Sequence, residues 1–181
     1  PYALFLLVFV IAPLLVLFYY AFTDGQGQFT IANLTGFFTN PNTLGTLCYS
    51  FALAIVTTAV CLLLAYPIAY ILAFSNIKSK SVILMLFVMP MWINFSLRIT
   101  ALKEVLTVLE GNLAMHPFLN AVIGMTYDFL PFMILPIYTT ISRLDKALRE
   151  AAMDLGANEF ETFLKITLPL SVPGIISGVS M

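Results

Sequence analysis

Long apolar stretches alternate with short polar segments along the whole chain. A helix needs about twenty apolar residues to cross the ~30 Å hydrocarbon core of a bilayer. The pattern predicts spanning helices over about 1–22, 46–74, 82–98 and 119–141, and a fifth, incomplete one at 172–181. We therefore expect an all-α fold, a polytopic transmembrane helical bundle formed by a single domain over 1–181.

Aromatic and polar residues mark the ends of these windows. A cluster of aromatic side chains closes the first window and suits the membrane–water interface: Phe18, Tyr19, Tyr20 and Phe22. Residues 23–45 and 75–81 then read as loops. The third window contains Pro90 and loses its pure apolarity from Asn94 to Arg98, after which an amphipathic stretch runs to residue 118.

Composition agrees with a membrane protein. Hydrophobic residues make up 61% of the chain and charged residues 9%, against about 25% charged in soluble domains. Membrane lipid is therefore an expected partner, whereas a net charge of −1 gives no basic field for nucleic acid. Cys48 and Cys61 lie about 20 Å apart on one helix, too far for a disulfide, so both read as small buried hydrophobes.

The distribution of Lys and Arg predicts the orientation. The loops after the second and fourth windows carry most of the basic residues: Lys78, Lys80, Arg143, Lys146, Arg149 and Lys165. The loops after the first and third windows carry only Arg98 and Lys103. This bias places the N-terminus and the 75–81 and 142–170 loops in the cytoplasm.

The 142–170 loop has the pattern of two short amphipathic helices. Apolar residues recur on one face of the first helix: Leu144, Leu148, Ala151, Ala152 and Leu155. Ser142 and Asp145 read as a variant capping box before it, and Gly156 as the left-handed residue that follows it. Asn158 reads as the cap of the second helix, with Glu161 at the third position.

The second helix has its own apolar side and a predicted end. Phe160, Phe163 and Leu164 form that side, and Pro169 is expected to end the helix. Ser171 and Pro173 then fit the start of the fifth span.

Two partners are possible for these amphipathic helices. They can lie on the membrane surface, or they can dock in a groove of another protein. Several carboxylates on their polar face disfavour anionic lipid and favour the protein groove: Glu150, Asp154, Glu159 and Glu161.

A longer motif makes the second alternative specific. Glu150, Ala151 and Ala152, then Gly156, then Ile166, Leu168 and Pro169 fill every defining position of EAA-x3-G-x9-I-x-L-P. The loop thus resembles the EAA loop of ABC-importer permeases. Around Pro131 to Tyr138, and around Pro90 to Arg98, the chain is also similar to the permeases of spermidine/putrescine importers.

This resemblance implies a type I ABC importer with the MetI-like permease fold, in a bacterial plasma (inner) membrane. Two six-span permeases would form the channel, so the sequence would be a fragment lacking the end of span five and span six. The EAA residues named above would couple the channel to a cytoplasmic ABC ATPase dimer. A periplasmic or lipoprotein solute-binding protein would deliver the solute, with polyamines the expected class.

Catalytic and cofactor chemistry is not expected in this chain. The phosphate-binding pattern G-x-x-x-x-G-K-[ST] does not occur, so ATP would be bound by the partner subunit, and no cofactor, metal site or enzymatic activity is predicted.

Asp128 is the exception to the apolar character of the fourth window, because carboxylates at membrane depth are costly and usually face a cavity or a partner. It either contacts a cationic solute or pairs within the protein, for instance with Arg98. Tyr127, Trp92 and Asn94 are further candidates for the solute path. A secondary transporter or channel using Asp128 as an ion or proton site is the alternative function.

Overall fold

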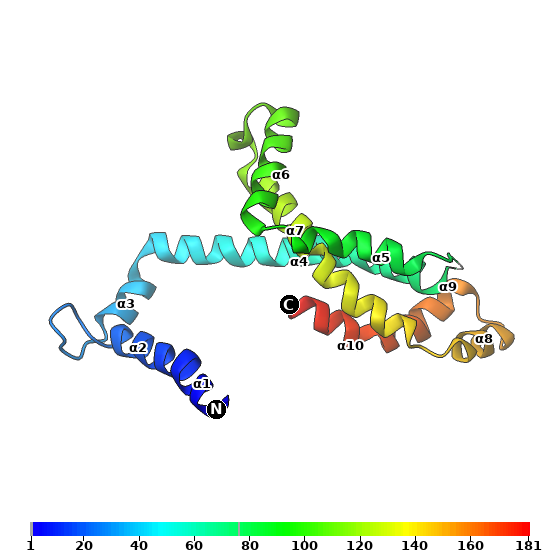
Figure 1. The fold of residues 1–181 in the computed structure, drawn as a ribbon, viewed down its shortest axis with the longest axis horizontal. Helices are drawn as coiled ribbons and strands as arrows, with labels where there is room; N and C mark the ends of the chain where they lie inside the picture. The colour runs from blue at the N-terminus through cyan, green and yellow to red at the C-terminus, as the bar shows by residue number, and fades with distance from the viewer. Residues whose placement is uncertain (1, 76) are drawn as a thin grey trace. The chain divides into compact units, whose positions relative to one another are not determined.

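The computed structural model describes residues 2–75 and 77–181 and divides the chain into two compact units, 1–52 and 53–181. Within the described residues, four helices are long and apolar enough to cross a membrane: Leu4–Ala21, Pro41–Phe74, Pro117–Ser142 and Glu159–Val179. A bent pair of helices adds a fifth candidate (Figure 1). The all-α membrane fold predicted from the sequence is confirmed.

Unit 1 holds the first predicted span and the start of the second. α1 (Tyr2–Leu6), the π-helical turn η1 (Leu7–Ile11) and α2 (Ala12–Ala21) follow one another without a break. The predicted loop over 23–45 contains a further short helix, α3 (Ala32–Thr39), and α4 (Pro41–Phe74) begins before the predicted residue 46. Cys48 is exposed, so its expected burial is wrong.

Two π-helical turns lie just before prolines inside continuous helices. η1 ends two residues before Pro13, and η4 (Phe163–Thr167) ends two residues before Pro169. In each turn a backbone N–H reaches back five residues, from Ala12 to Leu7 and from Leu168 to Phe163. This wider turn moves the carbonyl that a proline ring would strike in a regular helix.

Pro169 therefore does not end a helix, and that prediction is wrong. α9 (Glu159–Thr162), η4 and α10 (Leu168–Val179) form one continuous helical segment. Ser171 is correspondingly not a cap: it is fully buried inside α10, and its hydroxyl donates to the carbonyl of Leu168.

The core of unit 2 lies between α4 and α7 (Pro117–Ser142). On α4, small residues recur at every fourth position and are buried: Cys61, Ala65, Ala69 and Ala73. Ile134 and Ile137 of α7 are completely buried against them. In lipid, helices associate through close packing of such small residues, because the tails are as apolar as the side chains.

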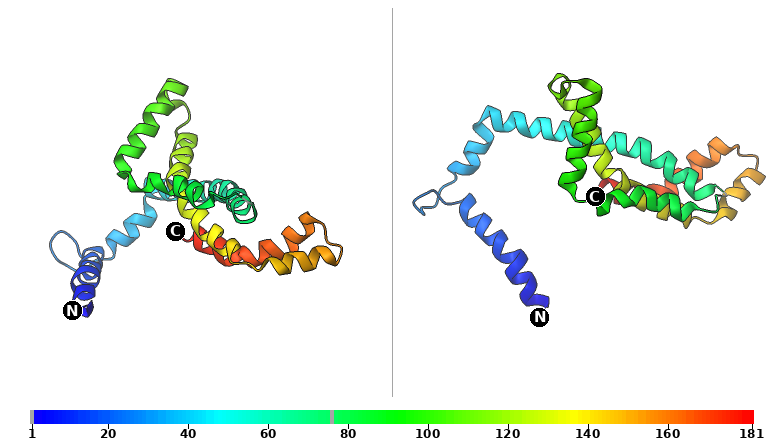
Figure 2. Two further views of the ribbon diagram at one scale, coloured as in Figure 1. Left: turned by 45° about the vertical axis from the view of Figure 1, so that its right-hand side comes forward. Right: turned by 45° about the horizontal axis from the view of Figure 1, so that its top comes forward.

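α10 lies beside α7 in both views of Figure 2, and two glycines make this possible. A Cβ atom added at Gly174 would lie 2.6 Å from Thr140 Oγ1 and 2.9 Å from the carbonyl oxygen of Pro136. One added at Gly178 would lie 2.6 Å from Met133 Sδ. The two helices are thus in backbone contact at Gly174.

The third predicted span, 82–98, is divided in the structure. α5 (Lys80–Val88) leads into the 3-10 turn η2 (Met89–Trp92), and α6 (Phe95–Glu110) starts at an angle of 100° to it. Pro90 cannot continue the α-helical hydrogen bonding, and the Asn94 side chain accepts a hydrogen bond from the Ser96 N–H, which starts the new helix. A short 3-10 turn, η3 (Leu113–Met115), leads from α6 to α7.

Candidate functional site

The segment between α7 and α10 begins with α8 (Lys146–Asp154), which contains the EAA residues. Asp145 caps it: the side-chain oxygen accepts a hydrogen bond from the Ala147 N–H at 3.0 Å. The predicted cap at Ser142 is wrong, because α7 continues to that residue. Asp145 has the extended backbone that an N-cap requires, whereas Ser142 is helical.

Gly156 reverses the chain after α8. Its φ is +90°, a conformation that costs residues with a Cβ atom. The N–H of Gly156 donates to the Met153 carbonyl and the N–H of Ala157 to the Ala152 carbonyl, the bond pair of a Schellman motif. Gly156 is thus the left-handed residue after the first helix, as the sequence predicted.

A complete capping box starts the second helix. The Glu161 N–H donates to Asn158 Oδ1 at 2.8 Å, and the Asn158 N–H donates to Glu161 Oε2 at 3.2 Å. The predicted cap at Asn158 and the predicted N3 position of Glu161 are confirmed. Together with Asp145 and Gly156 they fix the shape of residues 145–169, which we call the coupling segment after the role that the resemblance implies.

The coupling segment leaves large apolar side chains uncovered. Leu155 is 90% exposed, Phe160 68% and Leu148 50%. In Figure 1 the segment lies beyond the ends of α7 and α10, where its two short helices form a separate corner of unit 2. Apolar surface of this kind, rimmed by charges, marks an interaction site.

The motif residues themselves differ in burial. Glu150, Ala151 and Pro169 are exposed, and Ala152, Ile166 and Leu168 are half-buried. The half-buried members face unit 2 and the exposed members remain accessible, so the segment is attached on one side and open on the other.

A second site joins α6 to α7 through a buried ion pair. Arg98 Nη2 lies 2.6 Å from Asp128 Oδ1, and the two residues are 8% and 3% exposed. Arg98 Nη1 also donates to the Pro90 carbonyl at 3.1 Å, across the break between η2 and α6. The pair suggested as one alternative by the sequence is therefore present, and it holds the bend against α7.

Of the other candidate path residues, only Tyr127 has a described contact with the ion pair. Tyr127 is half exposed, and its ring centroid lies 5.9 Å from the Arg98 guanidinium carbon. Trp92 is 81% exposed, and Asn94 serves as the α6 cap. Their part in a solute path stays a prediction.

The family model of the binding-protein-dependent transport system inner membrane component matches residues 65–181. The chain belongs to this family. The matched region of the permease contains the end of α4, the Arg98–Asp128 pair and the whole coupling segment.

Characterised relatives agree with this assignment. The permease is 35% identical to the spermidine/putrescine transport system permease protein PotB of Haemophilus influenzae, over 96% of this chain. It is 38% identical to PotB of Escherichia coli over 83% of this chain, and 28% identical to the inner membrane ABC transporter permease protein YdcU of that organism, again over 83%. The aligned part spans 67%, 59% and 56% of these relatives' own lengths.

One contact of the coupling segment was missed from the sequence. Arg149, interpreted only as a topogenic charge, stacks its guanidinium 4.6 Å from the ring centroid of Phe74 and lies 3.5 Å from Glu159 Oε1. The sequence pattern that could have indicated this contact is the recurrence of aromatic residues at every fourth position near the end of α4, which places them on one face of the helix.

Proposed function

We propose that this chain is the permease subunit of an ATP-driven importer for polyamines such as spermidine and putrescine. A second permease subunit would complete the channel, a separate ATPase dimer would bind and hydrolyse ATP, and a solute-binding protein would deliver the solute. Family membership and the two PotB relatives support this proposal. The chain itself would perform no catalysis.

One observation carries the proposal: a locally fixed coupling segment with an uncovered apolar side. Leu148, Leu155 and Phe160 are half to almost fully exposed. Water does not favour this surface, and the neighbouring carboxylates disfavour anionic lipid. A groove in the ATPase offers both an apolar floor and complementary charge.

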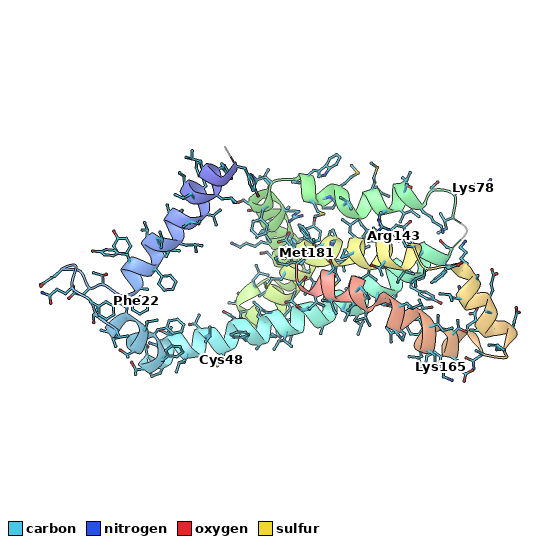
Figure 3. The ribbon with its side chains drawn as sticks, turned by 90° about the horizontal axis from the view of Figure 1, so that it is seen from below. Phe22, Cys48, Lys78, Arg143, Lys165 and Met181 are labelled. Carbon is cyan, nitrogen blue, oxygen red and sulfur yellow. The ribbon has the colours of Figure 1, made fainter. Side chains whose placement is uncertain are left out.

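The orientation is part of the same proposal. Figure 3 shows Lys78, Arg143 and Lys165 toward one end of unit 2. The positive-inside rule assigns that end, and with it the coupling segment, to the cytoplasm. The N-terminus would be cytoplasmic as well, and the loop after the first span periplasmic.

The orientation is tested by single cysteines at Lys78 and Thr35, after replacement of the exposed Cys48. In intact cells an impermeant thiol reagent should label position 35 and spare position 78. The reverse pattern would contradict the orientation.

The proposed solute path runs past Asp128, and here the ion pair adds a condition. A cationic solute can use the carboxylate only by sharing or displacing Arg98, which lies 2.6 Å away. The alternative function, a secondary transporter with Asp128 as its ion site, is disfavoured for the same reason. The Asp128 carboxylate is paired with Arg98 and is therefore not free to bind a proton or an ion.

The proposal is tested by co-expression of the permease with an ATPase, a second permease and a solute-binding protein from the same organism. The ATPase should co-purify with the wild-type chain. Proteoliposomes should take up radiolabelled spermidine only when ATP is present on the side of the membrane that carries the ATPase. Leu155→Glu should release the ATPase. Leu63→Glu would not be a matched control, because Leu63 lies in a spanning helix. Ala147→Glu, exposed on α8, is the matched control. Uptake driven by an ion gradient without ATP would contradict the proposal.

A further inference from the structure

Three aromatic residues follow one another at every fourth position near the end of α4: Tyr66, Tyr70 and Phe74. This spacing places them on one face of the helix. The rings of Tyr70 and Phe74 lie 4.9 Å apart, at an angle of 61°. We call these three residues the aromatic ladder.

The middle of the coupling segment packs against the ladder through Phe163. Its ring centroid lies 5.8 Å from that of Tyr66 and 5.5 Å from that of Tyr70, with interplanar angles of 81° and 87°. Edge-to-face contacts of this kind are a preferred aromatic geometry. Phe163 is also the first residue of the π turn η4, and its carbonyl accepts the five-residue bond from Leu168.

Both ends of the stretch from α8 to the start of α10 contact the ladder as well. At one end, the Arg149 guanidinium of α8 lies 4.6 Å from the Phe74 ring centroid, within cation–π range. At the other, the Tyr66 hydroxyl and the Ser171 hydroxyl of α10 share a hydrogen bond of 2.9 Å. Ser171 is fully buried, so this bond is shielded from competing water.

These contacts matter for α8, because turns interrupt its covalent connections on both sides, whereas α9 and η4 continue directly into α10. Between α7 and α8 the backbone leaves the helical conformation at Asp145, and between α8 and α9 it reverses at Gly156. A displacement of α8 can be absorbed at such turns. Packed aromatic rings, in contrast, hold or separate as a unit.

Resting on the proposed function, we infer that the aromatic ladder connects the coupling segment directly to α4. Movement imposed by the ATPase then displaces α4 together with α7 and α10. Arg149 and Phe163 act as positioning residues on the coupling segment, and they pack against the ladder residues Tyr66, Tyr70 and Phe74.

A fluorophore beside the ladder tests this inference in the assembled transporter. Ile71, next to Tyr70 and 58% exposed, is replaced by Cys and labelled with bimane after Cys48→Ser and Cys61→Ala. The complex with its ATPase is placed in nanodiscs, and emission is compared with and without ATP. The ladder variants are Tyr70→Leu and Phe163→Leu, and Tyr70→Phe keeps the ring. Leu63→Ala truncates an exposed α4 residue one turn before Tyr66 and leaves all three rings in place.

We expect ATP to change the emission at position 71 in the parent, in Tyr70→Phe and in Leu63→Ala. Tyr70→Leu and Phe163→Leu should each lose more than half of this change, while ATPase co-purification and basal hydrolysis are retained. If Tyr70→Leu prevents assembly, Phe163→Leu decides, since it leaves α4 unaltered. A full response in the assembled ladder variants, or none in the parent, would overturn the inference.

Failure of the proposed function gives a different result. The parent would then not retain the ATPase, or would take up no spermidine, whatever happens to the ladder. Loss of spermidine uptake with an intact ATP response at position 71 refutes spermidine as the solute but agrees with the inference that the ladder connects the coupling segment to α4.

Discussion

The helical interior around α7 and the coupling segment hold their shapes in opposite ways. In the interior, conformation depends on distant contacts: Ile134 and Ile137 are completely buried, and Gly174 lets α10 touch α7. In the coupling segment, conformation depends on local caps at Asp145, Gly156 and Asn158, while large apolar side chains remain exposed. A segment folded by its own caps can keep its form while it moves and while it docks.

This comparison predicts that interior substitutions cost stability, whereas coupling-segment substitutions cost transport. The largest effect is expected at the buried ion pair. Asp128→Leu leaves Arg98 buried without its partner, which typically costs about 3–5 kcal/mol. Denaturant unfolding in detergent micelles should show the loss, and the double variant Arg98→Leu with Asp128→Leu should recover most of it.

The double variant also separates two roles of Asp128. If spermidine uptake returns together with stability, the carboxylate serves the fold. If stability returns and uptake does not, the charged pair serves the solute path in addition to the fold. Wild-type stability in Asp128→Leu alone would contradict the account of the pair.

The next largest effect is expected where α7 and α10 touch. Gly174→Ala adds a methyl group 2.9 Å from the Pro136 carbonyl oxygen, and such overpacking costs about 1–3 kcal/mol. Gly178→Ala should cost less, because the nearest atom is the flexible end of Met133. Thermal unfolding measures both.

Gly45→Ala in α4 is the matched control. No heavy atom of the described residues lies within 4 Å of the added Cβ, so helix propensity alone should stabilise it by up to about 1 kcal/mol. Equal effects at Gly174 and Gly45 would refute the close contact of α7 with α10.

A smaller and purely local effect is expected at the second cap. Asn158→Ala removes the acceptor for the Glu161 N–H, and loss of such a cap costs about 1 kcal/mol. Amide hydrogen exchange should rise in residues 159–163 without a change in the exchange of α7. Asn158→Ser, which keeps an acceptor, should behave as the wild type, and faster exchange throughout α7 would contradict a local role.

The sequence predicted the local motifs of the coupling segment better than the interior. Asn158 is the predicted cap with Glu161 at the predicted N3 position, and Gly156 has the predicted positive φ. Such motifs depend on a few neighbouring residues, and sequence spacing contains that information. The predicted cap at Ser142 was wrong because Asp145, a better acceptor in extended backbone, lies three residues further on.

The errors lie where a distant contact or a rare turn decides. Pro169 does not end its helix, and the π turn η4 that precedes it has no local pattern that distinguishes it from an α turn. The bend between η2 and α6 depends on Arg98 reaching both Pro90 and Asp128. The ladder contact of Phe163 joins residues almost a hundred positions apart, so hydrophobic periodicity could not reveal it.

The central claim is that the coupling segment transmits ATP hydrolysis to the channel, and Gly156 tests it most directly. Among the described residues no heavy atom lies within 4 Å of a Cβ added at Gly156, so a substitution there acts through φ alone. Gly156→Val strains the turn, whereas Gly156→Asn tolerates it, since Asn adopts positive φ more readily.

The measurement is solute-stimulated ATP hydrolysis by the reconstituted transporter, with spermidine and the binding protein present. We expect Gly156→Val to insert normally and to lose stimulated hydrolysis and uptake, and Gly156→Asn to retain most of both. Normal stimulated hydrolysis and uptake in Gly156→Val would contradict the assignment of residues 145–169 as the coupling segment.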